Sequence, residues 1–190
     1  MKVALFFGSF NPVHVGHLII AQSVLNETDV DRVWMVVSPQ NPFKKKAGLL
    51  REYDRLRMVE MATEDNPSIH ASNEEFLLPK PSYTIDTLTH LAEKFPSYEF
   101  CIIMGEDNLK YIHKWKNYEA LLKYYPIYCY PRLGSEGEHF ERYPEVNRFE
   151  MPYLDISATR IRKMISEGKS VRYMVPEGAF HYLEKEGFYR

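Results

Sequence analysis

The chain has 190 residues, which is long enough for the core of one domain, and we expect a single domain over residues 1–190. Hydrophobic residues make up 45% and charged residues 26% of the sequence, a balance that excludes an intrinsically disordered chain. A formal net charge of -2 gives no general attraction to nucleic acid or to an anionic membrane, so any phosphate site must be built from local basic groups.

The cysteines and the apolar runs indicate in which cellular compartment the protein is expected. Cys101 and Cys129 stand in apolar stretches without Cys-x-x-Cys spacing, so we expect reduced core residues rather than a disulfide framework or a zinc knuckle. The apolar run at the start of the chain is too short for a signal peptide, and no later run approaches the ~20 apolar residues of a membrane span. A cytoplasmic protein is therefore expected.

Short apolar runs alternate with amphipathic segments along the whole chain. The pattern predicts strands at 2–7, 32–38, 69–72, 100–104, 127–130 and 148–151. It predicts helices from Gly16 to about residue 25, and at 51–65, 82–95, 107–113, 118–124, 158–167 and 176–185. The segment 134–145 is polar and is expected to be a surface loop.

This alternation predicts an α/β fold, a doubly wound parallel sheet with right-handed crossovers. Ligands on such sheets bind outside the carboxyl ends of the strands. Gly8, Ser38 and Gly105 follow three of the predicted strands, so the chemistry is expected at that edge.

The strongest local signal lies between the first strand and the first helix, in the segment GSFNPVHVGH at 8–17. It is neither a Walker loop nor a Gly-x-Gly-x-x-Gly fingerprint. His14 and His17 are three residues apart, so both rings can face one side at the start of a helix, and Gly16 leaves room for a ligand at the backbone. Free amides at a helix N-terminus favour an anion, so the segment suits phosphate oxygens.

Two other interpretations of the histidines stay open at this point. They can be ordinary polar loop residues that cap a helix. A histidine pair can also chelate zinc, although the nearest further candidate, His113, is distant in sequence and no Cys or Glu completes a ligand set.

The segment 8–17 resembles the signature of the nucleotidylyltransferases with the His-x-Gly-His motif. Further segments are similar, in order and approximate spacing, to the bacterial nicotinate-mononucleotide adenylyltransferases: YTIDTL at 83–88, GED at 105–107, KW at 114–115, ISATRIR at 156–162, and the tail from VP at 175–176 to GFY at 187–189. The resemblance runs from residue 3 to residue 189. The first and last motifs fit the whole superfamily, whereas 84–88 together with 114–115 favours this member.

The resemblance implies a Rossmann-like nucleotidylyltransferase fold and transfer of the adenylyl group of ATP to nicotinate mononucleotide. The products would be nicotinate adenine dinucleotide (deamido-NAD) and pyrophosphate, in NAD biosynthesis. Mg²⁺ is expected on the ATP phosphates, with no protein ligand. Nicotinamide mononucleotide or phosphopantetheine are alternative acceptors, a non-catalytic nucleotide sensor is an alternative from another class, and the sequence leaves a homo-oligomer open.

The resemblance also implies roles for particular residues. His14, His17 and Arg162 are the expected catalytic residues, acting on phosphate oxygens and the leaving group. Contacts to ATP are expected from Gly8, Ser9, Phe10, His14, Gly16, His17, Gly105, Asp107, Ser157, Thr159 and Arg162. Contacts to the mononucleotide are expected from Lys44, Lys45, Thr84 and Trp115.

Each of these assignments has a plainer alternative. Ser157 suits an N-cap and Asp107 a helix cap, Trp115 suits a core, and a lysine run such as 44–46 is usually solvated. In the family a histidine commonly precedes the basic residue of this loop, whereas here Phe43 stands there, so the roles of Lys44 and Lys45 rest on the resemblance alone.

Overall fold

Short runs rich in valine, isoleucine and aromatic residues form one six-stranded sheet in the order β3-β2-β1-β4-β5-β6. The computed structural model describes residues 1–40, 48–132 and 138–190. All five strand pairs are parallel. The strands are β1 (Lys2–Gly8), β2 (Arg32–Val37), β3 (Ile69–Ser72), β4 (Glu99–Gly105), β5 (Ile127–Tyr130) and β6 (Asn147–Arg148). The expected doubly wound parallel sheet is confirmed.

Helices connect the strands and follow the last one. They are α1 (Val15–Glu27), α2 (Glu52–Thr63), α3 (Thr84–Lys94), α4 (Glu106–Leu109), α5 (Tyr118–Tyr124), α6 (Glu138–Arg142), α7 (Ala158–Ser166) and α8 (Glu177–Glu186), with 3₁₀ turns η1 (Glu74–Leu77) and η2 (Ile112–Lys114). Among the described residues, no helix combines the length and the apolar character that a membrane crossing requires.

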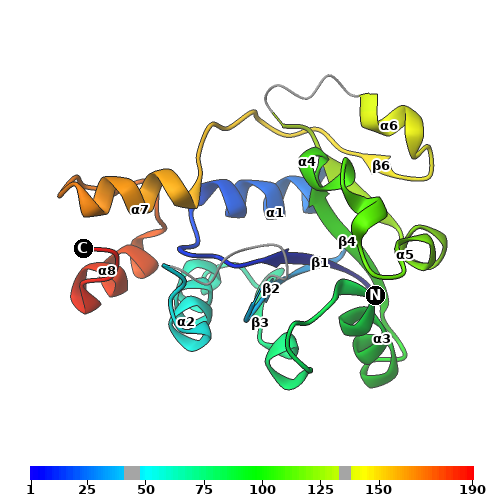
Figure 1. The fold of residues 1–190 in the computed structure, drawn as a ribbon, viewed down its shortest axis with the longest axis horizontal. Helices are drawn as coiled ribbons and strands as arrows, with labels where there is room; N and C mark the ends of the chain where they lie inside the picture. The colour runs from blue at the N-terminus through cyan, green and yellow to red at the C-terminus, as the bar shows by residue number, and fades with distance from the viewer. Residues whose placement is uncertain (41–47, 133–137) are drawn as a thin grey trace.

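The two faces of the sheet bury separate groups of apolar side chains. Because side chains alternate along a strand, Ala4 and Phe6 of β1 face the layer built from α1, α2, α7 and α8, whereas Val3 and Leu5 face the layer built from α3, α4 and α5. Figure 1 shows α1 and α3 on opposite sides of the sheet. The sheet is thus buried on both faces, as its continuous apolar strands predict.

Two helices begin at neighbouring points beside the carboxyl end of β1. Figure 1 shows α1 and α7 running in opposite directions from this place. The two chain segments are in close contact there, because a Cβ added to Gly16 would lie only 2.6 Å from Cγ2 of Ile156. Gly16 and Ile156, which are some 140 residues apart in the sequence, therefore meet at the strand edge where the site was expected.

Several predicted boundaries were wrong in the second half of the chain. The predicted helix 107–113 is two short pieces, α4 and η2, and the predicted strand 148–151 is the shorter and earlier β6. Residues 138–142 of the expected polar loop form α6, where Phe140 packs against the core and Tyr143 is buried just beyond the helix. The turn η1 was not predicted.

Candidate active site

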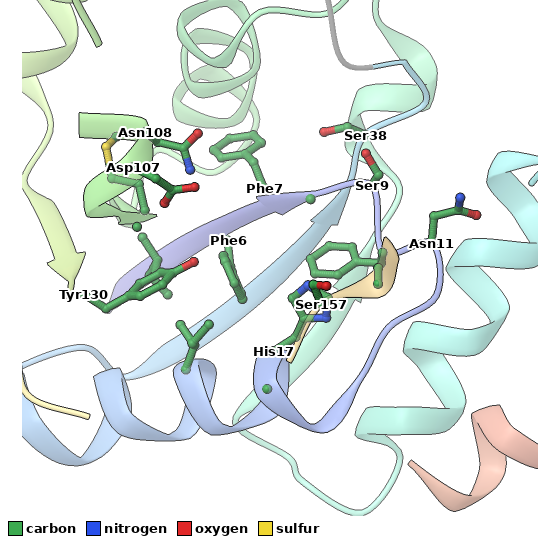
Figure 2. Close-up of a pocket in the computed structure, with 18 of the residues that line it drawn as sticks. Phe6, Phe7, Ser9, Asn11, His17, Ser38, Asp107, Asn108, Tyr130 and Ser157 are labelled. Atoms are coloured by element: carbon green, nitrogen blue, oxygen red, sulfur yellow. The ribbon is translucent and has the colours of Figure 1, made fainter. Parts of the chain in front are cut away.

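A cleft with a volume of about 530 Å³ opens at the carboxyl edge of the sheet. Its walls come from the loop after β1, the start of α3, the end of β4, the end of β5 and the start of α7. Every predicted site residue in the described part of the chain lines this cleft. Figure 2 shows Phe6 and Phe7 between the two sides, with His17 and Ser157 on one side and Asp107, Asn108 and Tyr130 on the other.

The two histidines form a stacked pair at the start of α1. Their ring centroids are 3.7 Å apart with an angle of 24° between the planes. The backbone N–H of His14 donates to Nδ1 of His17 over 3.1 Å, so the neutral His17 ring carries its proton on Nε2. The ring of Phe10 also packs edge-on against His17, with 5.0 Å between the ring centroids.

His14 lies deeper than His17 and is 6% exposed. Burial, with a smaller contribution from the charge of Arg132, lowers its pKa to about 4. His14 is therefore neutral near pH 7. Its buried Nδ1 has no hydrogen-bond partner in the described part of the structure.

Two glycines bring other groups close to the backbone of the cleft. A Cβ at Gly16 would lie 3.0 Å from Nδ1 of His14, in addition to its contact with Ile156. A Cβ at Gly105 would collide with the carboxylate of Asp107 and would lie 3.0 Å from the ring of Tyr130. A side chain at either position would displace these neighbours, so glycine permits the close packing seen here.

The N-terminus of α7 supplies hydroxyl and guanidinium groups. Ser157 is the N-cap, and its Oγ accepts the backbone N–H of Arg160 at 3.3 Å. Arg162 donates to the carbonyl of Asn11 at 2.8 Å and to Oγ1 of Thr159 at 3.3 Å. Arg162 thus ties α7 to the histidine loop at a place rich in donors for an anion.

The wall opposite the histidines carries an exposed acidic side chain. Asp107 is exposed and forms an ion pair with Arg132, with 3.4 Å between Oδ1 and Nε. The guanidinium of Arg132 also lies over the ring of Tyr130, 5.3 Å from its centroid. Burial raises the pKa of the Tyr130 hydroxyl to about 12, so this ring remains neutral. The wall offers a carboxylate oxygen and a flat aromatic–guanidinium surface.

The start of α3 and the turn η2 form a third wall. Thr84 is the first residue of α3, and Trp115 follows η2 with its ring partly buried against the core. Lys116 bonds Asp86 at 2.8 Å and lies over the ring of Tyr83 at 5.1 Å, which joins the two segments. The structure therefore brings Thr84 and Trp115 to one cleft although they are far apart in sequence.

Lys44 and Lys45 lie outside the described residues. In the described ranges 1–40, 48–132 and 138–190, no group of three His, Cys, Asp or Glu side chains is placed to hold a metal ion.

Sequence reasoning missed Arg55, which is fully buried on α2. Its guanidinium donates to the carbonyls of Ser9, Ser38, Pro39 and Leu50 at 2.6 to 3.2 Å. It thereby clamps the loops that follow β1 and β2. The available signal was an arginine in the apolar stripe of α2, three and four residues before two core side chains.

Asn11, Arg132 and Glu75 were also missed as parts of the site. Asn11 is buried, and its side chain binds the carbonyl of Gly48, the N–H of Leu50 and the hydroxyl of Tyr189. Glu75 is a buried carboxylate that lines the cleft. These contacts join segments separated by up to 178 residues, so no local sequence pattern predicts them.

Comparisons with known proteins agree on one family. Residues 5–164 match the family model described as cytidylyltransferase-like. A protein of Flavobacterium johnsoniae named "Probable nicotinate-nucleotide adenylyltransferase" is 49% identical over 192 residues, which cover 100% of both chains. A protein of Cytophaga hutchinsonii with the same name is 49% identical over 189 residues, covering 100% of this chain and 98% of its own.

A solved structure has the same fold. It is the nicotinic acid mononucleotide adenylyltransferase of Plasmodium falciparum complexed with NaAD, which superposes with a TM-score of 0.82 at 19% identity and covers 99% of this chain and 97% of its own.

Proposed function

Because this chain belongs to the cytidylyltransferase-like family and, within it, to the nicotinate-nucleotide adenylyltransferases, we propose that it joins nicotinate mononucleotide to the AMP part of ATP. The products are nicotinate adenine dinucleotide, the precursor of NAD, and pyrophosphate. The observation that supports this best is the meeting of the α1 and α7 N-termini around His14 and His17, in a cleft that also holds Asp107 and Trp115.

We assign the ATP half of the cleft from its hydrogen-bond donors and its carboxylate. The N-termini of α1 and α7 with His17, Ser157 and Arg162 suit a polyphosphate, because amides, hydroxyls and a guanidinium fork all donate to anionic oxygens. Asp107 suits the ribose hydroxyls, since a carboxylate accepts from both. Glycine at position 105 makes room for the carboxylate of Asp107 and the ring of Tyr130, which form this wall.

The acceptor half follows from the third wall. Trp115 offers a large flat ring on which a pyridine can stack. Thr84 offers a hydroxyl for the carboxylate of the nicotinate. Lys44 and Lys45, from the basic loop after β2, are assigned to the phosphate of the mononucleotide by the family resemblance.

The reaction is an in-line displacement at the α-phosphorus of ATP. An oxygen of the mononucleotide phosphate forms the new P–O bond, and the bond to the bridging oxygen breaks with its electron pair leaving on pyrophosphate. Catalysis then consists of positioning and charge stabilisation, without a covalent enzyme intermediate. The Nε2–H of His17 donates to a phosphate oxygen, and Arg162 binds the leaving pyrophosphate.

We write the adenylyl donor as MgATP, because Mg²⁺ in nucleotide sites is held mostly by phosphate oxygens and water. The donors around His17, Ser157 and Arg162 bind phosphate oxygens and fit this complex. When bound, Mg²⁺ would supply charge neutralisation for the leaving pyrophosphate, which His17, Ser157 and Arg162 would hold.

The test is pyrophosphate release with MgATP and three acceptors offered separately: nicotinate mononucleotide, nicotinamide mononucleotide and phosphopantetheine. We expect strong preference for the nicotinate compound. Equal use of the amide would refute the substrate assignment, and binding of ATP without turnover of any acceptor would indicate a nucleotide sensor.

A further inference from the structure

The side chain of Glu75, the second residue of η1, is a buried carboxylate in the wall of the cleft. Glu75 is only 2% exposed. Buried carboxylates are usually paired with a basic group, because an isolated charge is costly away from water. In the described part of the chain, none of the ion pairs includes Glu75, and its partners are hydroxyl groups instead.

The partners flank the start of α3: Ser82 precedes the N-cap residue Tyr83, and Thr87 lies in the first turn. The Ser82 hydroxyl donates to Oε2 over 2.9 Å, and the Thr87 hydroxyl donates to Oε1 over 3.0 Å. These two hydrogen bonds fasten the start of α3 to η1, the turn that directly follows β3.

Thr84, the first residue of α3, lies in the chain between Ser82 and Thr87, the two residues that Glu75 binds. Its place at the cleft is therefore set by hydrogen bonds on both sides, from Ser82 and from Thr87. A site discriminates between two small polar groups only when its own donors and acceptors are held in register. Nicotinate and its amide differ in one such group. A small shift of this turn should therefore change the preference between the two mononucleotides more than it changes the binding of ATP.

We propose that Glu75 is a positioning residue for the acceptor: it holds Thr84 in place through Ser82 and Thr87, and so contributes to the preference for nicotinate over nicotinamide mononucleotide. This inference rests on the proposed function. It assigns Glu75 no contact with the reacting atoms.

The first test is Glu75→Gln, which keeps the size of the side chain but replaces one acceptor oxygen with a donor. One of the two hydroxyls then loses its acceptor and the turn shifts. We expect kcat/KM for nicotinate mononucleotide to fall about tenfold and its preference over the amide to fall at least about threefold. The KM for MgATP should change by less than about twofold, because His17, Ser157 and Asp107 are untouched.

The neighbouring Glu74 provides the matched control. Its carboxylate bonds Lys94 at 2.8 Å and His90 at 3.3 Å, and it does not line the cleft. Glu74→Gln should leave both acceptor constants unchanged. Equal effects of the two substitutions would refute the role of Glu75.

Three further variants distinguish this role from a merely structural one. If Glu75 acts through Thr84, Glu75→Gln should change the acceptor preference little in a Thr84→Ala background, whereas additive losses would contradict the proposal. Thr87→Val removes one of the hydroxyls in an isosteric side chain and should reproduce part of the loss, while Thr87→Ser keeps the hydroxyl and should restore the wild-type preference. These variants keep the test open even if Glu75→Gln does not fold.

The wild-type enzyme is measured first with nicotinate mononucleotide. Absence of turnover refutes the proposed function. Turnover with an unchanged acceptor preference in Glu75→Gln and Thr87→Val refutes only the role of Glu75.

Discussion

Replacing Gly16 with alanine tests whether the close approach of α1 and α7 builds the phosphate end of the cleft. The new Cβ would lie 2.6 Å from Cγ2 of Ile156 and 3.0 Å from Nδ1 of His14. Carbon atoms rest about 3.5 to 4.0 Å apart, so the α7 side must move by about 1 Å. A misplacement of about 1 Å costs on the order of 10²-fold in rate, and we expect kcat/KM to fall about a hundredfold.

The assay is pyrophosphate release with MgATP and nicotinate mononucleotide, with urea unfolding to show that the fold persists. The double variant with Ile156→Ala removes the closest atom, so it should recover about tenfold of the loss, the contact with His14 remaining. Gly178→Ala is the control, because its Cβ would crowd the carbonyl of Met61 at 3.1 Å between α8 and α2 and should leave kcat/KM unchanged. Full activity of the Gly16 variant, or no recovery in the double variant, would refute the reasoning.

Four other substitutions address separate parts of the structure. His17→Ala should lower kcat by about 10²- to 10³-fold, the scale for loss of one transition-state donor, and near-normal single-turnover rates would exclude this role. Asp107→Asn should raise the KM for ATP about tenfold through loss of a charge-assisted hydrogen bond; a rise only in the KM for the mononucleotide would contradict its place at the ribose. Arg55→Met leaves four carbonyls without their buried donor and should lower the free energy of unfolding in urea by about 3 to 5 kcal/mol, whereas the exposed Arg57→Met should change it by less than about 0.5 kcal/mol. The pKa of His14 is lowered to about 4 in the folded protein, against about 6.5 in the unfolded chain. Because the unfolded chain binds this proton more tightly, the free energy of unfolding should fall by up to about 3 kcal/mol as the pH falls from about 6.5 to about 4. His14→Gln should flatten this decline in unfolding measurements, and an unchanged pH dependence would show that His14 does not cause it.

The fold could be predicted from the sequence because its signals are local. The apolar runs that became β1, β2 and β4 end at Gly8, Ser38 and Gly105, and that alone indicated the edge of the sheet where the cleft lies. The motif of His14 and His17 is equally local, since a spacing of three places both rings at one end of a helix.

The supporting contacts of the site could not be predicted in this way. Arg55 binds the carbonyl of Ser9, 46 residues away, and Tyr189 reaches Asn11 across 178 residues. These long-range hydrogen bonds depend on how the helices pack on the sheet, and that packing cannot be read from a single sequence. Glu75 shows the same limit. The sequence alone does not distinguish it from the adjacent Glu74, which pairs with Lys94, until Ser82 and Thr87 are placed beside it.

The most direct test of the proposed reaction follows the α-phosphate of ATP into the product. The protein is incubated with nicotinate mononucleotide and MgATP isotopically labelled at the α-phosphate, and the products are separated and identified by mass spectrometry. We predict that the label appears in nicotinate adenine dinucleotide and that the released pyrophosphate carries none. Labelled AMP without dinucleotide, or label that stays entirely in ATP, would contradict adenylyl transfer to this acceptor.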